Sequence, residues 1–307
     1  TYSVDQAGDK AFESGGEGRD RVISTLSYSL GGQAIEILQL QGTADLNGFG
    51  NLLDNLMIGN DGNNVLNGGG GADALYGGLG DDTFYIDNLA DRAYESAGGG
   101  RDRVISSVSY SLTGQDVEIL ELAGPDSING FGNDLDNRLI GNAGNNILDG
   151  GAGIDSLTGG AGADSFAWSS ASHSVLGAVD RVTDFATGTD TVDLRAVRTG
   201  ASDTFSIITN GANRILDVDL GGDGSIDMRI VFENASLVSG DILWDTTAAA
   251  SLTSDRAAIE AGHVEGGKPD LFAPEYYSIE QMLSTWYAVG NGGYVPPYRN
   301  VNFLRGS

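Results

Sequence analysis

Single apolar residues recur every nine positions through much of this chain, separated by runs of glycine, asparagine and aspartate. The register holds over two sets of repeats, at residues 50–85 and 132–167. Six residues of each nine-residue repeat suit a turn, because glycine adopts positive φ angles at little cost. The other three predict one short strand with a single inward side chain.

The predicted inward position is apolar in every repeat. The residues at this position are Met57, Leu66, Leu75, Phe84, Leu139, Leu148, Leu157 and Phe166. Two repeats complete one coil of about 18 residues, which stacks the apolar side chains in a ladder. Such a coil buries little area alone, so we expect its polar turns to need a further source of cohesion.

The pattern is duplicated without a gap. Residues 1–85 align with residues 83–167 at a constant offset of 82, which indicates two copies of one structural unit. We assign the first unit to residues 1–82 and the second to residues 83–168, and expect more units before Thr1. Residues 23–40 and 105–122 alternate apolar and polar positions and predict strand pairs flanking the turns.

Composition excludes several classes of protein. The chain has 43 acidic and 16 basic residues, a formal net charge of −27, so we expect no nucleic-acid partner. The absence of cysteine excludes disulfides and thiolate metal sites. The longest apolar runs are too short for a membrane span.

The sixth position of each repeat carries a side chain with an oxygen ligand. These residues are Asp73, Asp82, Asp155 and Asp164 in the later repeats, and Asn55, Asn64, Asn137 and Asn146 in the earlier ones. Stacked carboxylates repel one another, and a dication between adjacent turns removes that cost. Ca²⁺ suits a cage of carboxylates and turn carbonyls better than Mg²⁺, which retains water in a rigid octahedron. We therefore predict several Ca²⁺ ions held mainly by the aspartates, with the asparagines as weaker ligands or hydrogen-bonded ladders.

Three further aspartates are secondary metal candidates. Asp20 lies in another match to the repeat, Asp102 lies in a near match, and Asp91 follows Asp82 by nine residues. The arginines on either side of Asp20 and Asp102 are the alternative partners of those two carboxylates.

The consensus G-G-x-G-x-D-x-U-x, where U is apolar, resembles the RTX, or haemolysin-type calcium-binding, repeat family. The resemblance implies an all-β fold, a right-handed parallel β-roll that is disordered without calcium and folds with it. It also implies a secreted bacterial protein, extracellular or at the cell surface, that is exported by a type I secretion apparatus.

The segment after the repeats, residues 169–244, resembles the one that follows the repeats in serralysin-type secreted proteins. The resemblance rests on Asp180–Phe185 and Gly188–Leu194 and implies a β-rich domain that caps the roll. The acidic run Asp219–Asp227 is spaced like an EF-hand loop but lacks its twelfth-place glutamate, so a hairpin is the preferred interpretation.

Residues 245–307 follow neither pattern and are rich in aromatic residues. Helical spacing at 254–261 and 279–289 predicts a tail of helices and loop. Packing against the chain's own β-structure is the simplest interpretation, and an interface, a recognition surface or an export signal are the alternatives.

The sequence contains no H-E-x-x-H, G-x-S-x-G or Walker A motif, so we expect a module that is not an enzyme. The preferred function is a calcium-binding module of a larger secreted protein with a structural or adhesive role, as in an S-layer, adhesin or matrix. One alternative is the tail of a secreted hydrolase, protease or epimerase whose catalytic domain lies upstream. Another is a module that binds a surface glycan or a partner chain, including a second copy of itself, through residues 245–307.

Overall fold

The computed structural model describes residues 1–13, 18–95, 97–244 and 256–259. The chain divides into two compact units, Thr1–Gly266 and Gly267–Ser307, and the second lies outside the described residues. The predicted helix at 254–261 is seen as a helical turn at residues 256–259, while the one predicted at 279–289 lies outside the described residues. Among the residues described, no helix is both long and apolar enough to cross a bilayer.

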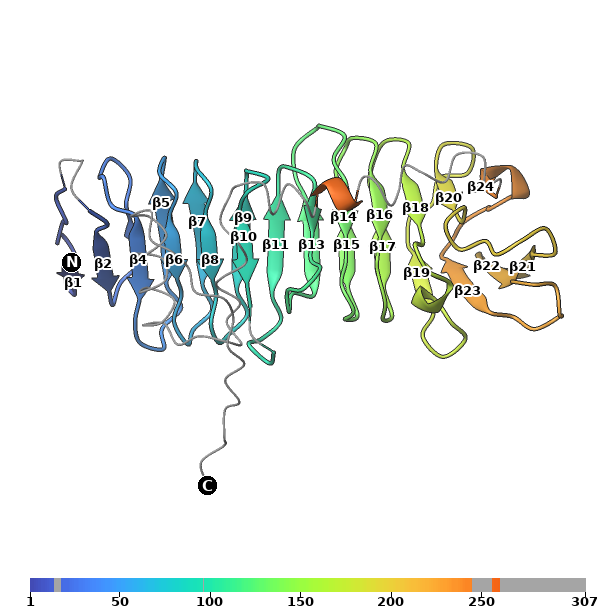
Figure 1. The fold of residues 1–307 in the computed structure, drawn as a ribbon, viewed down its shortest axis with the longest axis horizontal. Coiled ribbons are helices and arrows are strands. Elements are labelled where there is room, and N and C mark those ends of the chain that lie inside the picture. The colour runs from blue at the N-terminus through green and yellow to red at the C-terminus, as the bar shows by residue number, and fades with distance from the viewer. Residues whose placement is uncertain (14–17, 96, 245–255, 260–307) are drawn as a thin grey trace, which may run out of the picture. The chain divides into compact units, whose positions relative to one another are not determined.

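The described chain is an all-β coil whose short strands alternate between two faces (Figure 1). One face begins with a parallel sheet made, in spatial order, of β1 (Tyr2–Val4), β2 (Arg21–Ser24), β4 (Ile37–Leu40), β6 (Leu56–Ile58), β8 (Ala74–Tyr76) and β10 (Arg92–Tyr94). A separate parallel sheet contains β12 (Tyr110–Ser111), β14 (Gly130–Phe131), β16 (Ile147–Asp149), β18 (Ser165–Ala167), β20 (Thr191–Asp193) and β24 (Ile242–Leu243).

A third, longer sheet runs past both of these. Its parallel part contains β3 (Tyr28–Ser29), β5 (Asn47–Asn51), β7 (Val65–Gly69), β9 (Thr83–Ile86), β11 (Arg103–Ser106), β13 (Ile119–Leu122), β15 (Arg138–Ile140), β17 (Ser156–Thr158), β19 (Asp180–Val182) and β23 (Met228–Phe232). It ends in the antiparallel strands β22 (Asn213–Asp219) and β21 (Thr204–Asn210). Two short 3-10 helices, η1 (Ala171–His173) and η2 (Ser239–Asp241), lie in the connections.

The predicted apolar ladder is confirmed. All eight inward residues are fully buried, and they stack on partners two repeats away. Met57 pairs in register with Leu75, and Leu66 with Phe84. Each coil therefore closes after two repeats, as the spacing predicts, and places one leucine-sized side chain per strand in the core.

The two 82-residue copies present equivalent strands on opposite faces of the coil. β2 corresponds to β11 by the offset, yet β2 lies in the first sheet and β11 in the longest one. The second copy is thus shifted by half a coil relative to the first, and the strands of both copies form one continuous stack. The strand pairs predicted at 23–40 and 105–122 are present, as β2 with β4 and β11 with β13.

Residues 169–244 continue the stack. β19 pairs with β17 and β20 pairs with β18, both in parallel. Phe185 lies between Phe166 of the last repeat and Phe232, with ring centroids 6.0 and 5.2 Å away. These rings extend the apolar ladder beyond the last repeat, and the capping role of this segment stays a prediction.

The acidic run Asp219–Asp227 forms the predicted hairpin connection between β22 and β23. The Asp219 carboxylate accepts hydrogen bonds from the backbone N–H groups of Asp223 and Gly224, and that of Asp227 accepts one from Leu220. These carboxylates therefore stabilise a turn, as aspartates in such loops commonly do.

Candidate functional site

Four buried aspartates mark the places where a turn of the coil enters a strand. They are Asp73 before β8, Asp82 before β9, Asp155 before β17 and Asp164 before β18. Residues two apart in an extended chain point the same way, so each aspartate turns inward like the core residue two places later. Each of the four is at most 2% exposed.

One oxygen of each carboxylate is held by the backbone one coil earlier. The Oδ1 atoms of Asp73 and Asp82 accept hydrogen bonds from the N–H groups of Asn55 and Asn64, at 2.7 and 2.6 Å. The second copy repeats this arrangement at Asn137 and Asn146, with distances of 2.8 and 2.9 Å. These bonds fix the direction of each carboxylate and tie successive coils together.

The other oxygen of each carboxylate is buried and has no hydrogen-bond partner among the described residues. Burial raises the pKa of Asp73 and Asp155 to about 8, that of Asp82 to about 7 and that of Asp164 to about 6. A buried polar atom left unsatisfied costs roughly 1–3 kcal/mol, and more when it is charged. Within the described part of the chain, each site therefore lacks a positively charged partner.

The first glycine of the repeat keeps the space beside this oxygen open. A Cβ atom at Gly68 would lie 2.1 Å from Asp73 Oδ2, and one at Gly150 would lie 2.2 Å from Asp155 Oδ2. Any side chain at these glycines would displace the carboxylate or whatever binds to it. Carboxylate oxygens set among turn carbonyls are the donors that calcium prefers, so the residues present fit a calcium ion.

The four asparagines at the sixth position are buried in hydrogen-bonded ladders. The Asn55 side chain accepts a bond from the Asn51 N–H at 2.8 Å and donates to the Ile35 carbonyl at 3.1 Å. The corresponding amide oxygens in the other three repeats also accept backbone N–H bonds; these residues are Asn64, Asn137 and Asn146. The sequence left open whether they bind metal or form ladders; the ladder is present, and a ligand role stays a prediction.

The three secondary candidates differ from one another. Asp91 uses both carboxylate oxygens for backbone N–H groups, including that of Asp73 at 2.9 Å. Asp102 Oδ1 accepts the Asp82 N–H at 2.8 Å, while its Oδ2 is buried without a hydrogen-bond partner among the described residues. The Asp20 side chain is 21% exposed, so it is the least enclosed of the three. The neighbouring cation Arg103 pairs with Glu121.

The sequence analysis did not identify two further aspartates that continue the stack of buried carboxylates. Asp180 and Asp190 take the places that a further repeat would fill, accepting bonds from the N–H groups of Asp155 and Asp164 at 2.9 and 3.0 Å. Asp180 also accepts a bond from the Trp168 indole at 2.7 Å. Longer connections displace both from the nine-residue register. A search for an aspartate two residues before an apolar residue, without the nine-residue spacing, would have found both of them.

Comparison with known proteins agrees with this geometry. Residues 49–84 and 131–166 match the family model described as RTX calcium-binding nonapeptide repeat (4 copies). The two matched stretches contain the four acidic turns, and the parallel stacking of their strands is the β-roll that the consensus predicts.

No curated protein shows significant similarity to the chain. One solved structure that resembles part of it is the AlgE6R3 subunit of the Azotobacter vinelandii mannuronan C5-epimerase. It is 25% identical, with 46% of this chain and 85% of that chain covered and a TM-score of 0.33.

Proposed function

We propose that this chain is a calcium-dependent folding module of a larger secreted bacterial protein, with a structural or adhesive role outside the cell. The observation that supports this most is the buried carboxylate oxygen without a partner in each of the four acidic turns. Metal binding to such a site stabilises the folded state directly, because the unfolded chain has no preformed site.

Calcium concentration is the natural switch for such a module. The chain carries a net charge of −27, and self-repulsion opposes collapse when no cation is bound. Extracellular calcium modules operate at about 10⁻⁴–10⁻³ M, well above cytosolic levels. The chain would therefore stay extended during type I export and fold after it leaves the cell.

A calcium titration followed by far-ultraviolet circular dichroism tests the proposal. At pH 8 in chelator we expect a coil spectrum, and a β-sheet spectrum as CaCl₂ is raised to about 5 mM, beyond the range of extracellular sites. Equal concentrations of MgCl₂ are the control and should produce far less β-structure. A chain that keeps its β-sheet spectrum in chelator at this pH would falsify the proposal.

The structural or adhesive role is supported by the duplication of a complete unit and by the lack of a catalytic motif in this sequence. Any sequence that precedes Thr1 in the intact protein would distinguish the structural or adhesive role from that of a non-catalytic tail of a secreted enzyme. Further 82-residue units there favour the structural role, whereas a catalytic motif favours a secreted enzyme.

A further inference from the structure

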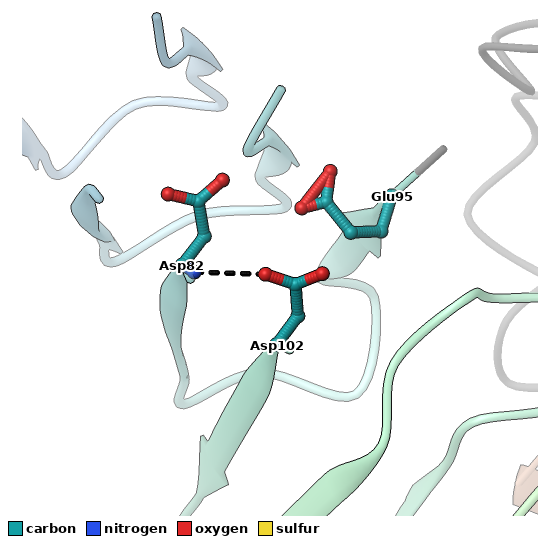
Figure 2. Close-up of side chains that lie close together, drawn as sticks. All are labelled: Asp82, Glu95 and Asp102. Carbon is teal, nitrogen blue, oxygen red and sulfur yellow. Dashed lines mark hydrogen bonds between the residues drawn. The ribbon is translucent and has the colours of Figure 1, made fainter. Parts of the chain in front are cut away.

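Three carboxylates converge where the first copy of the unit joins the second. Asp82 enters β9, Glu95 follows β10 and Asp102 enters β11, and Figure 2 shows the three side chains turned toward one another. One oxygen from each lies within 4.8 Å of the others. Glu95 and Asp102 lie outside the stretches that match the RTX repeat model.

Among the described residues, each of the three carboxylates is anchored by one oxygen and leaves the other without a partner outside the cluster. The Glu95 Oε1 atom accepts a bond from the Gly78 N–H at 3.0 Å, and Asp102 Oδ1 accepts one from Asp82 at 2.8 Å. Asp82 Oδ2, Glu95 Oε2 and Asp102 Oδ2 are buried, and no group of the described residues outside this cluster donates a hydrogen bond to them. The side chains themselves are 1%, 4% and 1% exposed, respectively.

Gly77 shows that two of these oxygens share one small space. A Cβ atom built on it would lie 2.2 Å from Asp82 Oδ2 and 2.4 Å from Glu95 Oε2. Three carboxylates gathered in such a space repel one another strongly unless a cation lies between them. Oxygen donors alone, with high negative charge, favour a hard dication and calcium in particular.

The arrangement does not recur 82 residues further along the chain. Glu95 and Asp102 belong to the second copy, and the same offset places Gly177 and Asp184 at the corresponding positions after it. Both oxygens of Asp184 accept backbone N–H bonds, from Gly159 and Gly160 at 2.8 Å each. In the first copy the offset gives Glu13 and Asp20 as the counterparts of Glu95 and Asp102. Two of the three carboxylates thus belong to the repeated unit, and Asp82, the last residue of the first copy, joins them where the copies meet.

We propose that Asp82, Glu95 and Asp102 bind a calcium ion of their own, more tightly than a turn with one unpartnered carboxylate, and fasten the second unit to the first. The inference deepens the proposed function and rests on it. It adds Glu95, which the nine-residue pattern does not contain, as a ligand.

The test compares Glu95→Gln with the unaltered full chain by isothermal titration with CaCl₂ at pH 8. Glutamine preserves the size of the side chain and an oxygen for the Gly78 N–H but removes the charge. We expect the tightest calcium site to be lost or weakened at least about tenfold, a change of about 1.4 kcal/mol. The control is Asp126→Asn, which removes one negative charge from an exposed turn and should leave the isotherm unchanged.

The outcomes separate this inference from the proposed function. If the unaltered chain binds no calcium, both this inference and the proposed function are wrong. An unaltered chain that binds calcium, together with an E95Q chain whose isotherm is identical, overturns this inference alone. If E95Q does not fold even in saturating calcium, crystals of the unaltered chain grown with calcium decide. Metal density among the three carboxylates supports the inference, and its absence there refutes it.

Discussion

Replacing both Asp73 and Asp155 with asparagine will give a chain that binds fewer calcium ions than the unaltered one yet is more stable without them. Asparagine keeps an oxygen for the N–H groups of Asn55 and Asn137 but carries no charge. The metal loses a charged ligand in each copy. At pH 9, above the pKa of about 8 that burial gives Asp73 and Asp155, the metal-free fold of this variant no longer buries two unpartnered charges. We expect it to gain roughly 1–3 kcal/mol per site there.

Calcium stoichiometry from titration calorimetry and the β-sheet signal in chelator from circular dichroism measure the two effects separately. The matched control is the pair Asp54→Asn and Asp136→Asn, which removes the same charge from exposed positions in the same copies. Those carboxylates accept bonds from Ala72 and Ile154 at 2.9 and 2.7 Å. If the control pair behaves like the buried pair, net charge controls calcium binding, and the ligand assignment is wrong.

The metal-free chain will become more stable as the pH falls from about 9 to 5. Burial holds the pKa of Asp73 and Asp155 at about 8 in the folded chain, against an ordinary value of 3.8. The folded state then binds protons more tightly than the unfolded state. Each group's stabilising contribution is complete below its ordinary pKa and is lost as the pH rises through the folded value, at up to about 1.4 kcal/mol per pH unit.

Circular dichroism of calcium-depleted protein across this pH range tests the sign of that dependence. The β-sheet signal should grow toward acid pH, because protonation neutralises the buried carboxylates that calcium otherwise compensates. In saturating calcium the same scan should be much flatter near neutral pH. A metal-free chain whose stability falls on acidification would mean that these carboxylates are already compensated in the fold.

The repeat predicts much of this structure because the nine-residue period fixes both which residues face the core and which lie in the turns. Leu66 and Phe84 had to face inward once the period was recognised, and their burial and pairing follow from it. The same period placed Asp73 and Asp82 at the entrance of a strand. Because successive coils stack in register, a position assigned in one repeat has the same place in the other matched repeats.

The sequence alone could not reveal contacts that depend on how the chain closes between repeats. Asp180 and Asp190 rejoin the ladder after longer connections, which the fixed spacing does not cover. Glu95 reaches Asp82 only because β10 places it beside the preceding turn. Whether an aspartate keeps an unpartnered oxygen, as Asp102 does, or satisfies both, as Asp91 does, depends on the local turn.

Anomalous diffraction from crystals grown in calcium tests the central claim most directly, because it locates the ions themselves. We predict peaks beside the Oδ2 atoms of Asp73, Asp82, Asp155 and Asp164, on the side that the repeat glycines leave open. Well-ordered turns with water or nothing beside those four oxygens, and no anomalous signal, would contradict the claim that calcium holds the coil together.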